Sequence, residues 1–452
     1  MARRDGFNYW CALFFVMAAS QYPAAVRGQG VAPQVQGTEL EAAYDRAFQA
    51  MLADPANLDK AFAFAELAAR VGDFEGAIGA LERMLFITPD LPRVRLELGV
   101  LYFRLGSYET ARAYIQSALA AQNVPPAVRD RAETFLAEID QRAKPHQFSG
   151  GVFAGIRYQT NANAGPGGTG VLVGGIPANL DDRFTAKSDR NLFAAANVQH
   201  VYDLQSQGGE TIESTANVYG SRQDKQKQVD VAVAQLTSGP RLKLPILPQA
   251  SIRPLLSLDY VILDGSRYFW APGAGASVRS QLGPTTGVEV SADVRDRRYL
   301  DNVQRPNNSN QDGIVKSASF QVRQQLFPAL QISGDVGFTD EQAREGSQAN
   351  EEWSFTLGAA VVFGTPLPFT GSPWTLSANA TRAFAYYDRV DPTIAPNVVR
   401  DDDDWRANVT LAVPLTDRFG LVATGGLFRR ESTISNFAYR NSFVSAGLSW
   451  RF

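Results

Sequence analysis

The sequence predicts an α+β protein of two parts, a helical repeat domain followed by a transmembrane antiparallel β-barrel of about 14 strands. Three patterns predict this: a short apolar segment at the start, a 34-residue period in an Ala- and Leu-rich region, and alternation of apolar and polar residues over the rest. The predicted divisions are a signal peptide at 1–20, a linker at 21–37, the helical domain at 38–144 and the barrel at 146–452.

Composition excludes two classes of protein. The 452 residues include 43 Lys and Arg against 46 Asp and Glu, a net charge of −3, so no nucleic-acid partner is expected. Hydrophobic residues make up 45%, yet the mean hydropathy is −0.18. The apolar residues are therefore dispersed among polar ones, which excludes a bundle of membrane-spanning helices.

The first apolar segment, Tyr9–Ala19, is typical of a secretory signal peptide. It follows Arg3 and Arg4 and precedes small residues. A run of roughly ten apolar residues is too short for a spanning helix, which needs about 20. The only cysteine, Cys11, lies inside this segment. Its removal with the signal would leave a chain without disulfides or cysteine-bound metals.

A 34-residue period follows the linker. It separates Pro55 from Pro89 and Gly72 from Gly106. The motif Leu98-Gly99, Tyr102, Gly106, Tyr108, Ala111 resembles the tetratricopeptide repeat, a stacked helix pair, and about three pairs fit between residues 38 and 142. Small residues allow close helix approach, aromatic ones fill gaps, and proline ends a helix. The residues assigned to repeat packing are Gly72, Ala77, Pro89, Gly99, Tyr102, Gly106, Tyr108 and Ala111. Such repeats either hold an extended peptide or partner protein, or serve as a spacer.

From residue 146 the apolar residues fall on alternate positions, which indicates strands. In the first run Phe148, Val152, Ile156 and Tyr158 share a face. Fourteen such runs follow one another, each about ten residues long. An even number is expected of an antiparallel barrel whose two ends emerge on one side.

The opposite faces of these runs are polar, which favours a membrane barrel over a soluble sandwich. In hydrocarbon every backbone donor and acceptor must be paired, so strands with an apolar outer face have to close on themselves. Charges of both signs argue against a strongly ion-selective pore. The residues expected to line the lumen are Arg253, Asp259, Glu289, Asp293, Arg295, Arg323, Arg406 and Asn408.

The joins between runs alternate in length, and this predicts an orientation. Tight joins at 283–285, 327–329 and 414–417 alternate with long ones such as 160–188 and 302–312. Short turns face the periplasm in outer-membrane barrels, so the helical domain is expected there and the barrel in the cell outer membrane.

Aromatic residues near the run ends are expected to form girdles at the two membrane interfaces. These residues are Tyr158, Tyr202, Tyr260, Tyr268, Trp353, Trp374, Trp405 and Trp450. The terminal pair Trp450 and Phe452 resembles the insertion signal read by the barrel assembly machinery, which is therefore an expected partner together with outer-membrane lipid and lipopolysaccharide.

Three other sequence features, the two histidines, a glycine-rich segment and a run of aspartates, do not indicate a catalytic, phosphate-binding or metal site. His146 and His200, the only histidines, show no metal-ligand spacing, so neither a zinc site nor a catalytic base is expected. The glycine-rich segment 165–170 lacks the helix of a phosphate-binding loop and is interpreted as part of a mobile outer loop that folds outside the barrel or into its lumen as a plug. Asp401–Asp404 are interpreted as a solvated loop flank rather than as a calcium or lipopolysaccharide bridge. The sequence predicts no enzyme, no cofactor and no metal.

Signal peptide, tetratricopeptide-like helices and a barrel ending in Phe452 together resemble the surface lipoprotein assembly modifier family. The segment Gly155-Ile-Arg-Tyr-Gln-Thr-Asn-Ala-Asn163 is similar to the one that opens that family's barrel. The resemblance implies a periplasmic domain that receives a client lipoprotein or related secreted protein, and a barrel that helps it cross. The alternatives are a polysaccharide exporter and a general diffusion porin with a periplasmic repeat domain.

Overall fold

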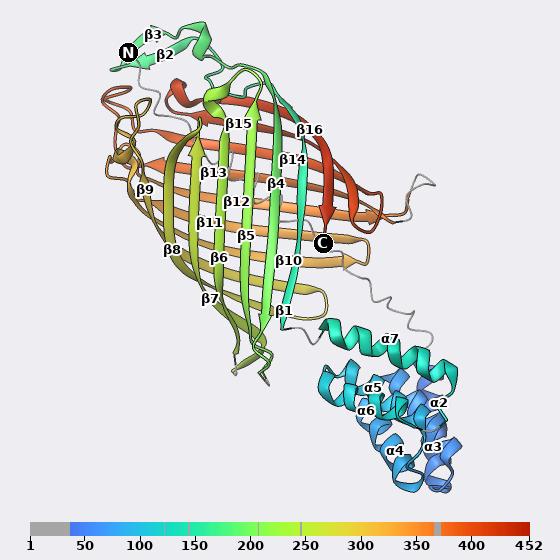
Figure 1. Ribbon diagram of the computed structural model, residues 1–452. Coiled ribbons are helices and arrows are strands. Elements are labelled where there is room, and N and C mark those ends of the chain that lie inside the picture. The colour runs from blue at the N-terminus through green and yellow to red at the C-terminus, as the bar shows by residue number, and fades with distance from the viewer. Residues whose placement is uncertain (1–36, 122, 143–144, 207, 245, 366–371) are drawn as a thin grey trace. The chain divides into compact units, whose positions relative to one another are not determined.

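The computed structural model describes residues 37–121, 123–142, 145–206, 208–244, 246–365 and 372–452 (Figure 1). The predicted signal peptide, and the predicted linker up to residue 36, lie outside the described residues. The chain divides into two compact units, one helical and one built of strands, with the boundary at Pro145 and His146.

The described residues of the first unit form six helices. They are α2 (Gly37–Ala53), α3 (Leu58–Val71), α4 (Phe74–Ile87), α5 (Pro92–Arg104), α6 (Tyr108–Leu119) and α7 (Pro126–Arg142). Helices α3 and α4 form one tight hairpin and α5 and α6 a second, with α2 packed on α3 and α7 packed on α6. None of these helices is both long and apolar enough to cross a bilayer.

Each helical hairpin turns at a glycine. Gly72 has φ +97° and donates its N–H to the Ala68 carbonyl, and Gly106 has φ +77°. A side chain is strained in this left-handed conformation, so the 34-residue spacing of these glycines reports the spacing of the turns.

The second unit is a closed antiparallel barrel of fourteen strands, as predicted (Figure 1). The barrel strands are β1 (His146–Gln159), β4 (Asp189–Asp203), β5 (Thr211–Gln223), β6 (Val231–Leu244), β7 (Leu247–Leu263), β8 (Ser266–Gln281), β9 (Thr286–Tyr299), β10 (Gly313–Phe327), β11 (Leu330–Glu341), β12 (Asn350–Phe363), β13 (Trp374–Tyr387), β14 (Asp401–Pro414), β15 (Phe419–Ser432) and β16 (Tyr439–Arg451). Strand β1 closes the ring on β16. The strands are longer than predicted, from 12 residues in β11 to 17 in β7.

The two faces of the barrel wall differ in polarity as the alternation predicts. Large apolar side chains on the outward face are exposed, among them Ile156, Leu256, Leu357 and Leu448. Strand pairing keeps these in register, because Val336 pairs with Phe320 on one side and Phe355 on the other. An exposed apolar band around a closed sheet is the surface that hydrocarbon covers.

The joins define two different ends of the barrel. At the short-turn end β10 and β11 are joined by residues 328–329, and β14 and β15 by residues 415–418. At the long-loop end the joins include 160–188, 300–312 and 388–400. Both ends have exceptions. The long-loop end contains the two-residue turn Asp264-Gly265, where both residues have positive φ, and the short-turn end contains the joins 204–210 and 364–373.

The longest loop carries a small hairpin, β2 (Gly170–Val173) with β3 (Ile176–Asn179). In its turn, the Gly174 N–H donates to the Thr393 carbonyl at 2.8 Å and the Gly175 N–H donates to the Ile394 carbonyl at 2.9 Å. The Asn436 side-chain amide accepts a hydrogen bond from the Leu172 N–H and donates one to the Leu172 carbonyl. The hairpin therefore lies against the neighbouring long loops, beyond the strand ends rather than in the lumen (Figure 1).

The seam where the ring closes depends on two glycines. Gly155 of β1 lies directly opposite Gly447 of β16. A methyl group on Gly155 would lie 2.3 Å from the Ala446 carbonyl oxygen, and one on Gly447 would lie 2.2 Å from that of Ala154. The two backbones thus approach more closely than side chains allow.

Candidate functional site

The residues predicted to pack the repeats lie at helix contacts and turns. Ala77 and Ala111 are fully buried. A methyl group on Gly99 would lie 2.4 Å from Ile115 Cγ1, so this glycine sets the separation of α5 and α6. Gly72 and Gly106 form the turns, and Pro89 follows the end of α4, where its carbonyl accepts a hydrogen bond from Arg95.

The two predicted tyrosines make aromatic contacts. Tyr102 stacks on Tyr114 with ring centroids 5.4 Å apart, and both hydroxyls donate to Glu82. Tyr108 packs on Phe103 at 5.7 Å. Burial and the Glu82 carboxylate raise the pKa of both Tyr102 and Tyr114.

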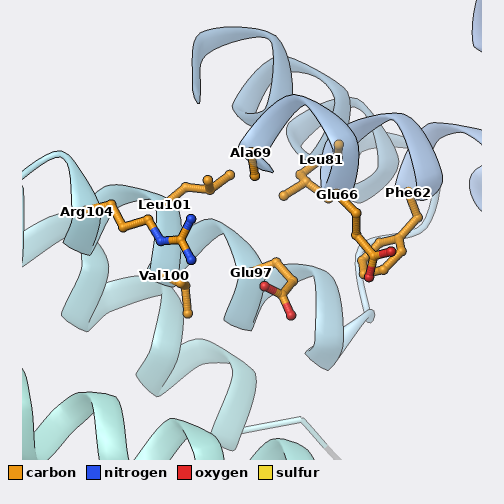
Figure 2. A pocket seen from close by; sticks show the side chains of 9 residues that line it. Phe62, Glu66, Ala69, Leu81, Glu97, Val100, Leu101 and Arg104 are labelled. Carbon is orange, nitrogen blue, oxygen red and sulfur yellow. The ribbon is translucent and has the colours of Figure 1, made fainter. Parts of the chain in front are cut away.

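A pocket opens between α3 and α5, with Leu81 of α4 at its back (Figure 2). Apolar side chains form its floor, and charged side chains stand at its edge. The lining residues are Phe62, Ala65, Glu66, Ala69, Leu81, Glu97, Val100, Leu101 and Arg104. An apolar floor with polar groups at the edge is the usual composition of a ligand pocket.

Charged partners from other helices orient the pocket carboxylates. Arg131 of α7 donates to both Glu97 oxygens, at 2.5 and 3.2 Å. Arg93 pairs with Glu66 at 3.2 Å and lies 4.5 Å from the Phe62 ring centroid. Arg104, on the other side of the pocket, has no ion-pair partner among the described residues (Figure 2). Arginines therefore neutralise both pocket carboxylates, and Arg104 adds a cation on the opposite side.

The eight predicted lumen residues all occupy inward positions in the strand register. Those on β7 and β9 form an ion-pair cluster, in which Arg295 lies 3.1 Å from Asp293 and 3.6 Å from Asp259. Glu289 pairs with Arg279 of β8, and Arg253 with Glu213 of β5. The other three lie on two strands: Arg323 on β10, and Arg406 and Asn408 on β14.

A second ion-pair network lines the lumen at the long-loop end of β14 and β15. Arg430 donates to both oxygens of Asp404 at 2.6 Å, and Arg406 donates to the same carboxylate at 2.7 Å. The members of this network, called the ion-pair wall below, are Arg400, Asp402, Asp404, Arg406 and Arg430, and the buried Glu352 of β12 lies near it. Exposed fractions of 4% for Asp402 and 2% for Asp404 show that these carboxylates are buried.

The prediction that Asp401–Asp404 form a solvated loop flank is therefore wrong. These residues begin β14, so alternate carboxylates point inward to the arginines and outward, where Asp403 pairs with Arg382. Inward arginines neutralise the inward pair, and within the described residues no group of three metal-ligating side chains occurs.

A buried apolar cluster occupies the inward side of β4 to β9 at the long-loop end, which the polar inward pattern did not predict. Its members, called the aromatic wall below, are Phe193, Ala195, Tyr219, Val233, Val261, Leu263, Tyr268, Phe269, Ala271 and Tyr299. Tyr268 was predicted for a membrane girdle, but it is buried here with 2% exposed. A register shift after Val261 brings Tyr268 inward beside Phe269.

The two walls lie on opposite sides of the ring. In the closed strand order β10 to β13 separate them on one side, and β16 and β1 on the other. Arg157 of β1 lies near the border, bonded to the Tyr219 hydroxyl at 3.1 Å and 4.5 Å from the Phe193 ring centroid.

The inward face near the short-turn end is basic. Arg241 pairs with Glu213 at 2.6 Å, and Arg279 with Glu289 at 3.0 Å. The inward cations of this region are Arg241, Lys243, Arg253, Arg279, Arg323 and Arg451, against Asp203, Glu213 and Glu289. The sequence predicted inward charges of both signs along the whole lumen. In the structure cations outnumber anions at the short-turn end, and the two signs are about equal at the long-loop end.

The structure brings the two histidines together, which their separation in the sequence concealed. His146 Nδ1 lies 2.9 Å from His200 Nε2, on the outward face of β1 and β4. Trp450 and Phe452 also lie on the outward face, with ring centroids 5.0 Å apart.

Comparisons with known proteins match the two units separately. A search of the curated proteins found no match. The anion-selective porin from Comamonas acidovorans is 9% identical, with 68% of this chain and 99% of that chain covered at a TM-score of 0.35. A bacterial polysaccharide outer membrane secretin is 11% identical, with 67% and 98% covered at 0.34. The type III secretion translocator chaperone SycD from Yersinia enterocolitica is 15% identical, with 24% and 78% covered at 0.22. Residues 65–137 match the tetratricopeptide repeat family.

Proposed function

We propose that this chain is an outer-membrane translocation factor that helps a lipoprotein or related secreted protein reach the cell surface. The helical domain docks the client in the periplasm and the barrel is its conduit. The resemblance to surface lipoprotein assembly modifiers supports the same role.

The observation that carries this proposal is the two-sided lumen. An unfolded polypeptide presents apolar and charged side chains along the same stretch of chain. Both walls are largely buried in the resting structure, with exposed fractions of 1–8% in the aromatic wall. In this proposal an entering client displaces the side chains packed over them and then contacts apolar groups on one side and charged groups on the other. A channel for small ions has no need of an aromatic side.

The pocket of the helical domain supports a docking role. Its apolar floor suits the side chain of an extended segment, and Arg104 at its edge offers a contact to an acidic group of that segment. Stacked helical repeats present such surfaces to extended peptides.

The barrel's outer face and joins support the proposed membrane placement. The outward band is apolar and closed, as a bilayer requires. The chain enters β1 at the short-turn end, the end that faces the periplasm in outer-membrane barrels. We therefore propose a periplasmic helical domain.

Transport in this proposal needs no chemistry by the protein itself. We propose neither catalytic residue nor cofactor. Client folding outside the cell prevents its return and gives the process its direction.

Site-specific photo-crosslinking tests the proposal. A crosslinkable residue replaces Leu101 in the pocket, Tyr219 in the aromatic wall, or the lipid-facing Phe355 as control. The same envelope protein is expected to be captured at Leu101 and Tyr219 and not at Phe355. Deletion of the chain should remove that protein from the set released by protease from intact cells. Capture at neither position, or an unchanged surface after deletion, contradicts the proposal.

A second candidate, a conduit for an anionic polysaccharide or for small anions, is favoured by the basic short-turn end. Reversal potentials in planar bilayers distinguish it. Replacing Arg241 and Arg279 by Gln should abolish anion preference if anions are the cargo, while client capture at Leu101 stays intact.

A further inference from the structure

Charged side chains on the outward face of the barrel occur only near the long-loop end. Among the described strand residues, the rest of this face is apolar or neutral in every strand. The outward basic residues are Arg190, Arg222, Arg267, Arg298, Lys316, Arg382, Arg429 and Arg440, and the acidic ones are Asp296, Asp340, Glu351, Asp401, Asp403 and Glu431. The outward face therefore carries charged side chains at the long-loop end of the barrel and uncharged ones at the short-turn end.

Three of these basic residues and one tryptophan form a continuous row of outward positions on neighbouring strands. Arg382 of β13 pairs with Trp405 of β14, Trp405 pairs with Arg429 of β15, and Arg429 pairs with Arg440 of β16. The Arg382 guanidinium lies 4.6 Å from the ring centroids of both Trp405 and Phe384. The row is called the arginine row below.

The arginine row contains a like-charged pair directly across two strands. Arg429 and Arg440 occupy opposed positions, which is destabilising when nothing neutralises them. Two carboxylates lie near the row: Asp403 pairs with Arg382 at 2.9 Å, and Glu431 pairs with Arg429. Arg440 is exposed and has no ion-pair partner among the described residues. The row thus retains one unneutralised cation beside a second arginine.

We propose that the arginine row binds a phosphate group of an anionic glycolipid in the outer leaflet of the membrane. Arginines present planar pairs of N–H groups that match phosphate oxygens, and a phosphate between Arg429 and Arg440 removes their repulsion. A lipid in that leaflet presents its phosphate at the level where the apolar band ends. This inference rests on the membrane placement in the proposed function and adds a ligand class to it.

The test uses the full mature chain in nanodiscs of phosphatidylethanolamine with or without lipid A. Native mass spectrometry after detergent release measures retained lipid A. The variant replaces Arg429 and Arg440 by Gln, and the control variant replaces Arg298 and Lys316 by Gln at the same level on other strands. A heat-dependent gel shift verifies that each barrel is folded.

Wild type and control should retain lipid A, and the Arg429/Arg440 variant should bind it about tenfold more weakly, the loss expected for charge-assisted hydrogen bonds. Without lipid A the same variant should be more stable than wild type, because the repulsion is gone. Inorganic phosphate and phosphatidylglycerol are the competing probes. If either probe displaces lipid A as well as free lipid A does, the site is not specific for a glycolipid and the proposal fails. It fails also if the Arg429/Arg440 variant retains as much lipid A as wild type. A chain that enters no nanodisc refutes the membrane placement instead.

Discussion

Asp404 is buried between two arginines on the lumen wall, with side-chain exposure of 3% for Asp404, 12% for Arg406 and 5% for Arg430. Replacing Asp404 by Ala leaves both arginines without their shared carboxylate. Removing one partner of a buried ion pair costs about 3–5 kcal/mol, so the free energy of unfolding should fall by about this amount. Urea unfolding in detergent micelles, followed by tryptophan fluorescence, measures it.

Lys316→Met is the control for that substitution. It breaks an ion pair with Asp340 on the outward face, where Lys316 is half exposed. Exposed pairs contribute little, so the unfolding transition should hardly move. Equal effects of the two substitutions would show that the Asp404 network adds nothing beyond a surface pair.

Gly447 gives a second residue-scale prediction. Ala at this position places a methyl group 2.2 Å from a backbone oxygen of β1, and backbone cannot move aside as a side chain can. Gly447→Ala should therefore reduce the fraction of chain that reaches the heat-modifiable folded form. Gly334→Ala is the matched control, because its nearest neighbour, in the Leu357 side chain, is 4.0 Å away. A fully folded Gly447→Ala barrel would contradict the closeness of the seam.

At the scale of the element, the helical hairpins make stability depend on pH through Tyr102 and Tyr114. Their pKa values are raised in the folded state, by burial and by Glu82. The stabilisation is thus complete below the unfolded value of about 10 and is lost as pH rises through the folded values. Helical circular dichroism should melt at lower temperature above about pH 10.

Glu82→Gln removes the charge while the tyrosines stay buried. The pKa values should move toward their ordinary range, so the loss of stability above about pH 10 should become smaller. Melting curves of the two proteins at a series of pH values provide the measurement. If the melting temperatures of the two proteins fall by the same amount as pH rises above about 10, Glu82 does not influence the pKa values of the tyrosines.

The elements that the sequence predicts well are those whose signal is periodic. Alternation gave the number of strands, because each strand has an apolar face in contact with the same medium. Gly72 and Gly106 revealed the helical hairpins, because only the turns require positive φ. Neither signal needs information about which segments pair.

What could not be predicted depends on register between strands. Asp404 and Arg430 are 26 residues apart and meet only because β14 and β15 pair in one particular alignment. The shift in register beside Tyr268, which turns that ring into the lumen, leaves no mark in the alternation. The contact of His146 with His200 likewise follows from the pairing of β1 with β4.

For the whole molecule, the proposed orientation predicts which residues face the outside of the cell. Val303 in a long loop and Ile246 at a short turn are exposed by 94% and 92%. A membrane-impermeant maleimide should label Val303→Cys on intact cells and Ile246→Cys only after the outer membrane is opened. In a Cys11→Ser background each variant carries one thiol, because the sequence contains a single cysteine. The reverse labelling pattern would invert the orientation.

The two-residue turn Asp264-Gly265 gives the long-loop end an uneven rim. On the β13–β16 side, loops and the β2–β3 hairpin rise beyond the strands, whereas β7 and β8 simply turn back. The loop 300–312 still covers Tyr268, so the low part of the rim is confined to the β7–β8 turn itself. Under the proposed function, a client that leaves the barrel would meet the least loop material at this turn.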